Sequence, residues 1–134
     1  MRAVLDASAV LAYLQDEPGA EVVEAALNDG ACVSAANWAE VLSKLAELDQ
    51  DPDEVAERFK QEGVLGEGLV VYPLDEAQAR RVARLRPTTR STGLSLADRA
   101  CLALATSLDL PALTADRAWA ELPSPLTTSV MLIR

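Results

Sequence analysis

Short apolar segments alternate with helical patterns along this chain, and this alternation limits the folds that it can adopt. Apolar runs of strand length occupy residues 2–5, 31–33, 69–72, 112–114 and 127–132. Helical periodicity fills the intervals, over residues 7–15, 18–29, 35–49, 52–62, 76–86 and 95–109. Buried strands separated by helices are typical of a parallel sheet that is covered on both faces. We therefore expect an α/β fold with a mainly parallel central sheet of four to five strands.

Prolines, glycines and aspartates predict where several helices begin and end. Pro18 in a first turn and Gly30 after a last turn bracket the second helix. Asp75 is placed to cap a helix that Pro87 would end, because proline removes a donor and clashes with the preceding turn. Asp116 is placed to cap a short helical turn after the fourth strand.

The composition predicts one globular domain over residues 1–134, and we expect it to be cytoplasmic. Half of the residues are hydrophobic, a quarter are charged, and no apolar run approaches the roughly 20 residues of a membrane span. Asp6 interrupts the apolar N-terminal segment, which argues against a signal peptide. The two cysteines, Cys32 and Cys101, lie far apart in apolar surroundings, as expected for a reduced pair.

The chain contains no histidine. This excludes Ser-His-Asp and Cys-His nucleophiles, HExxH zinc sites and hydrolysis with a histidine base. It also contains no GxxxxGK[ST] motif, and residues 63–68, which are rich in glycine, predict only a loop before a strand. Any chemistry must therefore depend on carboxylates, hydroxyls, arginines or a bound metal ion.

Two aspartates follow predicted strands directly or nearly so. Asp6 follows the first strand and Asp116 follows the fourth. If both strands are central and parallel, both carboxylates emerge at the same edge of the sheet, where α/β folds place their sites. Each aspartate could equally serve only as the N-cap of the next helix.

Asp98 lies within the apolar stripe of its helix. At 100° per residue, Leu94, Cys101 and Leu102 lie within about 60° of it. Since an unpaired buried carboxylate costs several kcal/mol, we expect Asp98 to need a partner. That partner is either a metal ion or a distant arginine, because the neighbouring Arg99 points about 100° away.

Four other polar residues have weaker signals. Glu40 lies nearly opposite the apolar centre of its helix, and its pattern alone predicts a solvated side chain. Ser8 and Thr114 each lie two residues from an aspartate, where a hydroxyl usually makes local hydrogen bonds. Asn37, one turn before Glu40, is expected to be structural.

The net charge of −9 opposes loose binding to nucleic acid, but the charge is unevenly distributed. Residues 1–79 hold 17 acidic and 4 basic side chains, whereas residues 80–134 hold 8 basic and 4 acidic. Arginine suits phosphate recognition, and the candidate contacts with a nucleic-acid backbone are Arg80, Arg81, Arg84, Arg86, Arg90 and Arg99. These arginines also fit a solvated helix face that pairs with the acidic half.

Four segments, taken together, resemble a known family. VLDASAVLAYL, SAANWAEVLSKL, LSLADRACLALA and LPALTADRAWA are similar in order and spacing to the motifs of PIN-domain nucleases, most closely the VapC-type toxins of toxin–antitoxin pairs. The resemblance covers nearly the whole chain. It implies a three-layer α/β/α fold and endoribonuclease activity.

The resemblance also implies which residues act. The family's acidic residues fall on Asp6, Glu40, Asp98 and Asp116, and its hydroxyls on Ser8 and Thr114. The three aspartates would hold metal, Glu40 would be a ligand or a base that orients water, and the hydroxyls would position water or phosphate. Four carboxylates in one pocket repel by about 4 kcal/mol per pair at 4 Å. Oxygen ligands favour Mg²⁺ or Mn²⁺, and one or two ions would relieve this repulsion.

Partners are implied in the same way. VapC-type proteins cut RNA to leave a 5′-phosphate and a 3′-hydroxyl, form homodimers and are inhibited by a cognate VapB-type antitoxin. The alternatives are a housekeeping PIN nuclease without an antitoxin and a non-catalytic PIN-like binding module. An aspartyl-phosphate protein is disfavoured, because Lys44 and Lys60 are the only lysines and neither lies late in the chain.

Overall fold

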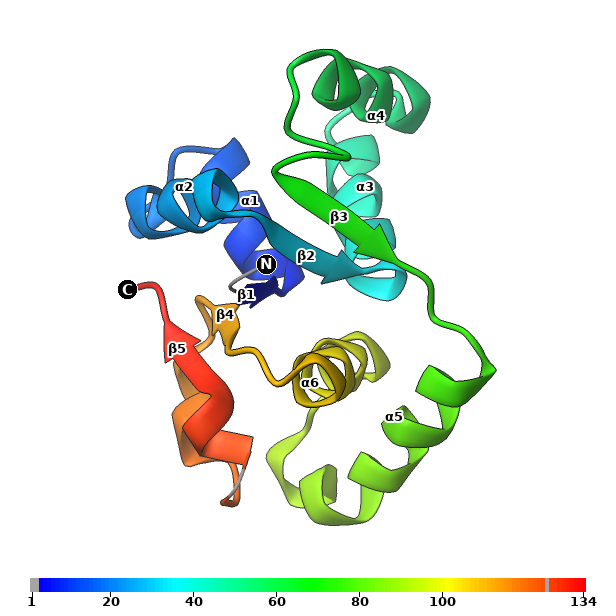
Figure 1. The fold of residues 1–134 in the computed structure, drawn as a ribbon, viewed down its shortest axis with the longest axis vertical. Coiled ribbons are helices and arrows are strands. Elements are labelled where there is room, and N and C mark those ends of the chain that lie inside the picture. The colour runs from blue at the N-terminus through cyan, green and yellow to red at the C-terminus, as the bar shows by residue number, and fades with distance from the viewer. Residues whose placement is uncertain (1–2, 125) are drawn as a thin grey trace.

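The computed structural model describes residues 3–124 and 126–134. Its centre is a five-stranded sheet of order β3-β2-β1-β4-β5, in which all neighbouring strands are parallel (Figure 1). The strands are β1 (Ala3–Leu5), β2 (Ala31–Ser34), β3 (Leu69–Tyr72), β4 (Ala112–Thr114) and β5 (Val130–Leu132). The expected parallel α/β fold is confirmed.

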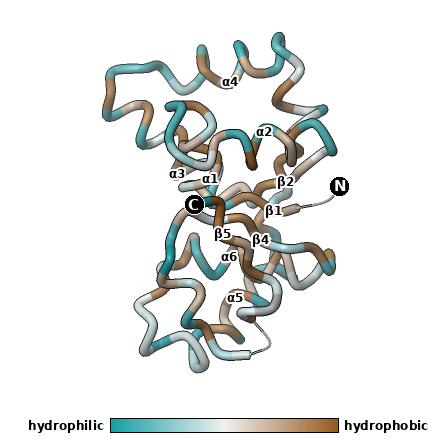
Figure 2. Tube along the Cα trace, turned by 90° about the vertical axis from the view of Figure 1, so that its left-hand side faces the viewer, coloured by the Kyte–Doolittle hydropathy of each residue, from teal (hydrophilic) through white to brown (hydrophobic). Residues whose placement is uncertain are grey.

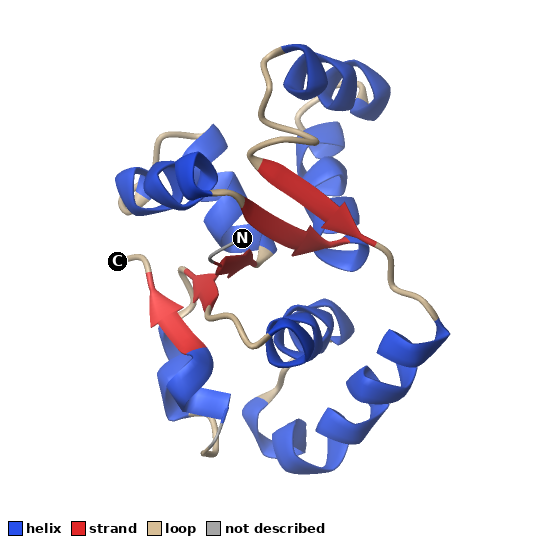
Figure 3. Cartoon of the chain, in the orientation of Figure 1, coloured by secondary structure: helices blue, strands red, loops and turns tan. Residues whose placement is uncertain are grey.

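Helices cover both faces of this sheet (Figure 3). They are α1 (Ala7–Leu14), α2 (Ala20–Asp29), α3 (Ala35–Glu47), α4 (Pro52–Gln61), α5 (Glu76–Thr89) and α6 (Leu96–Leu108). Short 3₁₀ turns occupy Arg90–Thr92, Arg117–Glu121 and Leu126–Ser129. The first four helices share one hydrophobic core, α6 lies against the other face, and α5 packs on α6.

Strand alternation separates the two cores. Ala3 and Leu5 of β1 point into the core shared with α1 to α4, whereas Val4 between them packs with Cys101 and Leu102 of α6. This is the period of two expected of a strand with both faces buried. The strands accordingly trace a hydrophobic centre through the molecule (Figure 2).

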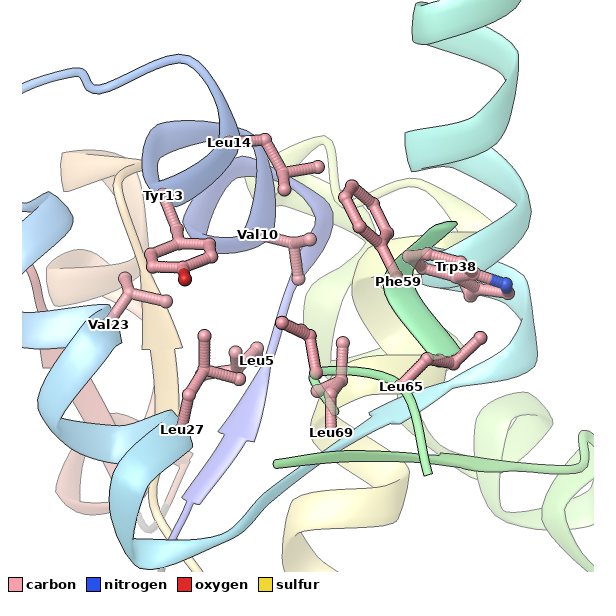
Figure 4. Close-up of a pocket in the computed structure, with 11 residues that line it drawn as sticks. Leu5, Val10, Tyr13, Leu14, Val23, Leu27, Trp38, Phe59, Leu65 and Leu69 are labelled. Carbon is pink, nitrogen blue, oxygen red and sulfur yellow. The ribbon is translucent and has the colours of Figure 1, made fainter. Parts of the chain in front are cut away.

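The core above β1 is filled by side chains. Leu5 and Val10 meet Leu69, Trp38 and Phe59 there (Figure 4). The space left between them is only about 10 Å³, which is no more than one water needs. This apolar region is therefore packing and not a ligand pocket.

The second helix begins later than Pro18 predicts. Its N-cap is Gly19, which has a left-handed backbone (φ 96°), and α2 starts at Ala20. A Cβ on Gly19 would lie 2.6 Å from the carbonyl oxygen of Ile133, so a close approach of the C-terminal segment fixes this turn. The prediction that the first strand begins at Arg2 falls outside the described residues.

Pro87 does not end its helix, contrary to prediction. Helix α5 continues to Thr89, with Pro87 exposed in its last turn. The hydroxyls of Thr88 and Thr89 both donate to the carbonyl of Leu85 and support this turn. The carbonyl that Pro87 leaves without a donor belongs to Ala83, an exposed residue, so water can replace the lost hydrogen bond.

The last strand is shorter than predicted. The predicted strand over 127–132 divides into a 3₁₀ turn at Leu126–Ser129 and β5 at Val130–Leu132. The polar residues at the start of the predicted strand form the turn, and only the apolar ones pair with β4.

The sheet topology sets the place of a site. Strand β1 is central and is paired with β2 on one side and β4 on the other, and the strand order reverses between β1 and β4. In open parallel sheets, the crevice at the carboxyl ends of such strands is where ligands bind. Among the described residues, no helix is long and apolar enough to cross a membrane.

The approach of Ile133 to Gly19 yields a stability prediction. Gly93 has the same left-handed backbone but open space around it, so Gly93→Ala is the matched control. Chemical unfolding should show a loss of about 1–2 kcal/mol for Gly93→Ala, which is the cost of backbone strain. Gly19→Ala should lose about 2 kcal/mol more through overpacking. Equal losses would contradict the close approach of Ile133 to Gly19.

Candidate active site at the carboxyl edge of the sheet

All four predicted acidic residues line one cleft. Asp6 follows β1, Glu40 lies on α3, Asp98 lies in the first turn of α6, and Asp116 follows β4. The cleft has a volume of about 170 Å³, and its other lining residues are Ala7, Ser8, Leu11 and Lys44. The fold therefore brings residues that are far apart in the sequence to one place.

Asp6 is the buried member of this group. The residue is 4% exposed, and its carboxylate accepts three hydrogen bonds. Ser8 Oγ and the Ala9 amide donate to Oδ1 at 2.7 and 2.8 Å, and Thr114 Oγ1 donates to Oδ2 at 2.5 Å. Asp6 is thus the N-cap of α1 and a cleft residue at once.

Ser8 and Thr114 join Asp6 to the segment that carries Asp116. The Ser8 hydroxyl accepts from the Ala115 amide at 2.9 Å, and the Thr114 hydroxyl accepts from the Asp116 amide at 3.0 Å. Each hydroxyl gives its only proton to Asp6. In this structure both hydroxyls therefore hold two acidic residues in register with one another.

Asp98 has a different environment from the one its helical pattern predicts. It is only half-buried, so the burial that its apolar stripe predicts is incomplete, and among the described residues no arginine forms an ion pair with it. Asp98 forms a capping box with Ser95, in which its Oδ2 accepts from the Ser95 amide at 3.0 Å. Asp98 lies in the first turn of α6, and its side chain borders the cleft.

Asp116 and Glu40 are both exposed. Asp116 Oδ1 accepts from the Ala118 amide at 3.0 Å and caps the 3₁₀ turn at Arg117–Glu121. Glu40 lies in the middle of α3 on the solvent side, as its pattern predicts, yet that side of α3 borders the cleft. Thus three of the four acids face the positive N-terminus of a helical turn, and Glu40 does not.

Burial dominates the acid–base behaviour of Asp6. Removal from water raises the pKa of Asp6 from 3.8 to about 6, and the nearby Asp98 carboxylate adds to the rise. The hydrogen bonds from Thr114, Ser8 and Ala9 act in the opposite direction but do not compensate. A positive charge in the cleft would lower this pKa again.

The donor set of the cleft suits a hard divalent cation. Carboxylate oxygens are the ligands that Mg²⁺ and Mn²⁺ prefer. Among the described residues, however, no three acidic or sulfur-bearing side chains are gathered as closely as a preformed metal cage requires. Mg²⁺ commonly retains several waters and binds through one or two carboxylates, so this looser arrangement fits it.

The thiols take no part in this cleft. Cys32 and Cys101 are free and buried. Burial raises the pKa of Cys32 to about 11 and that of Cys101 well above its usual value. Both side chains are therefore inert members of the core beneath α6.

One basic residue of α3 lines the cleft and was not predicted to do so. Lys44 lies one turn after Glu40 and lines the cleft with it. Asn37, one turn before Glu40, is fully buried and donates to the carbonyl of Ala97 at 3.1 Å, which fixes α3 against the start of α6. The spacing of Lys44 four residues after Glu40 was the available sequence signal for its place at the cleft.

The predicted arginine contacts lie elsewhere. None of the six arginines, all of which the structure describes, lines the acidic cleft. Arg99 donates to the carbonyl of Val82 at 3.2 Å, and Arg80 pairs with Glu76 at 2.9 Å. Arg81 and Arg84 border a separate groove of about 590 Å³ between α5, α6 and the segment around Leu126.

Comparison with known proteins agrees with this geometry. The family model of the PIN domain matches residues 3–124. The chain belongs to the PIN-domain family. Members of this family are nucleases. A comparison with curated proteins found no significant match.

Solved structures extend the likeness over the whole PIN domain. A toxin–antitoxin complex from Klebsiella pneumoniae has a TM-score of 0.68 at 19% identity, and the match covers 98% of both chains. FitAcB from Neisseria gonorrhoeae has a TM-score of 0.68 at 22% identity, covering 98% of this chain and 96% of that one. A VapBC-5 structure from Mycobacterium tuberculosis has 28% identity and a TM-score of 0.60, covering 100% and 99%.

The raised pKa of Asp6 predicts how stability depends on pH. Because the folded chain holds its proton up to about pH 6 and the unfolded chain only to about 3.8, folding is weakened as pH rises between these values. Without metal, the loss is at most about 3 kcal/mol. Asp6→Asn keeps an oxygen for Ser8 and Ala9 and should remove this loss.

Thermal and chemical unfolding in chelator from pH 4 to pH 7 checks this prediction. The stability of Asp6→Asn relative to the parent should rise with pH. Asp116→Asn changes the same charge at an exposed position and is the control. If the difference in free energy of unfolding between Asp6→Asn and the parent stays constant from pH 4 to pH 7, burial does not raise the pKa of Asp6.

Proposed function

We propose that this chain is a VapC-type toxin, a metal-dependent endoribonuclease that hydrolyses RNA phosphodiester bonds. The observation that carries the proposal is the arrival of Asp6, Glu40, Asp98 and Asp116 at one cleft on the carboxyl edge of a PIN domain. Four carboxylates at that place repel an anionic substrate such as RNA. Such a cleft is useful to a nuclease only if cations join it.

The proposed cofactor is Mg²⁺ or Mn²⁺, as one or two ions. Asp6, Asp98 and Asp116 would hold it, and Glu40 would be a further ligand or a base that orients water. When bound, a divalent ion supplies an acidified water and stabilises charge on phosphate. The residues supply the rest: Ser8 and Thr114 hold Asp6 in place and limit its motion relative to Asp116.

The capping hydrogen bonds support this assignment. In both Asp98 and Asp116, one carboxylate oxygen accepts a hydrogen bond from a backbone amide of the same turn. Among the described residues, the second oxygen of each accepts no hydrogen bond and is available to the cleft. A carboxylate held by one oxygen and open at the other is well oriented for a ligand role.

The proposed products are a 5′-phosphate and a 3′-hydroxyl, and the proposed setting is the cytoplasm. The similarity to toxin–antitoxin structures supports a cognate VapB-type antitoxin that inhibits the enzyme. The proposed oligomeric state is a homodimer. A PIN nuclease without an antitoxin would purify alone when co-expressed with its neighbouring gene. A pure binding module would show no stoichiometric uptake of Mn²⁺ by calorimetry.

Asp98→Asn tests the catalytic assignment. The amide still accepts from Ser95, so the fold should persist, while the charge at the cleft is lost. Cleavage of a labelled RNA should fall at least about a hundredfold, the scale of losing one electrostatic stabiliser. Asp109→Asn, at the exposed C-cap of the same helix, is the matched control and should cut at the parent rate.

The same assay addresses the metal. Chelator should stop cleavage by the parent protein, and Mg²⁺ or Mn²⁺ should restore it. Circular dichroism checks that Asp98→Asn is folded. Parent-level cleavage by folded Asp98→Asn, or undiminished cleavage in chelator, would contradict the proposed function.

A further inference from the structure

We propose that Lys44 binds a phosphate of the RNA strand at the mouth of the acidic cleft. The inference rests on the proposed function and adds to it a substrate-binding residue that neither the arginine pattern nor the acidic positions indicate. Lys44 is exposed on α3 and lines the cleft together with the four acids.

The position of Lys44 on its helix places it beside Glu40. The two residues are four positions apart, so their side chains project from the same face of α3. Lys44 lies in the last turn of α3, where the helix dipole favours a cation. Lys44 is therefore carried at one wall of the cleft by a helix and not by a loop.

Lys44 is the only basic side chain that lines this cleft among the described residues. Arg99 and Arg117 directly follow Asp98 and Asp116 in the sequence, but neither arginine lines the cleft. The guanidinium of Arg99 is turned to the carbonyl of Val82 on α5. A phosphate that enters the acidic cleft thus meets one cation supplied by this chain.

The ammonium group is not used within the protein. A lysine four residues after a glutamate commonly pairs with it, yet within the described part of the chain Lys44 forms no ion pair with Glu40 or with any other acid; the salt bridges there are Arg80 with Glu76 and Arg134 with Glu17. A lysine retained only to neutralise Glu40 would be expected to contact it. An unpaired ammonium leaves three donors for an anion.

Binding of phosphate by Lys44 predicts opposite effects on the affinities for metal and for RNA. A cation at the wall repels an incoming divalent ion and attracts phosphate. Removing Lys44 should therefore leave metal affinity unchanged or raise it several-fold, while it weakens RNA binding. A role in holding the acids together predicts a change in metal affinity alone.

The test compares Lys44→Ala and Lys44→Arg with Lys60→Ala. Lys60 is the other lysine of the chain, exposed on α4 and outside the cleft, and its loss changes the net charge equally. The rate constant kcat/KM for a short single-stranded RNA is measured over a range of salt concentrations. Mg²⁺ affinity without RNA is measured by calorimetry.

We expect kcat/KM of Lys44→Ala to fall about tenfold at low salt, mainly through KM, as for the loss of a charged hydrogen bond. Its salt slope should become shallower by about 0.7, the value for one phosphate contact on a single strand. Lys44→Arg should restore the slope, and Lys60→Ala should match the parent.

If the parent cuts RNA and Lys44→Ala has the slope and rate of Lys60→Ala, the role of Lys44 is refuted and the proposed function stands. A change in Mg²⁺ affinity with an unchanged salt slope would also refute it. If the folded parent cuts no RNA in Mg²⁺ or Mn²⁺, the proposed function and this inference both fail.

Discussion

The site depends on a single buried carboxylate at the end of the central strand. Asp6 is removed from water and held by three hydrogen bonds from α1 and β4. Burying a charge is costly unless partners compensate, and the raised pKa of Asp6 shows that they compensate only in part. The protein without metal therefore retains an electrostatic cost that a cation at the cleft would relieve.

The acids combine structural and chemical roles. Asp6, Asp98 and Asp116 each cap or begin a helical turn, and the cap holds each carboxylate in one orientation. Capping and ligation are often treated as competing explanations of a strand-terminal aspartate. Here the cap orients the group, and for Asp98 and Asp116 the second oxygen remains available for other uses. Three helical turns thus orient three of the four acids of the cleft.

Much of the fold follows from sequence pattern, since apolar strands and helical periods are local. Strands at 69–72 and 112–114 and the caps at Asp75 and Asp116 occur where the pattern predicts them. The predicted helix start near Pro18 was wrong because the turn at Gly19 is set by a distant segment, at Ile133. Asp98 was expected to be buried because a helical wheel places it among apolar residues, but the wheel does not show that this side of the first turn borders a cleft.

The residues that line the cleft were harder to predict from the sequence pattern than the fold was. Periodicity describes Glu40 and Lys44 as solvated, and both are, but it does not state which surface they border. Family resemblance indicated Glu40, and the only signal for Lys44 was its spacing of four residues from Glu40. Asn37 was expected to be structural. Its hydrogen bond to the carbonyl of Ala97 shows that it joins α3 to the start of α6.

The most direct measurement is an NMR titration of the Asp6 side chain in ¹³C-labelled protein, with the signal assigned from its absence in Asp6→Asn. In chelator, we expect titration with a pKa of about 6. With saturating Mg²⁺, the pKa should fall by at least about one unit, since a nearby cation favours the charged form. An ordinary value near 3.8 without metal, or no response to Mg²⁺, would contradict the central role of a buried and cation-sensitive Asp6.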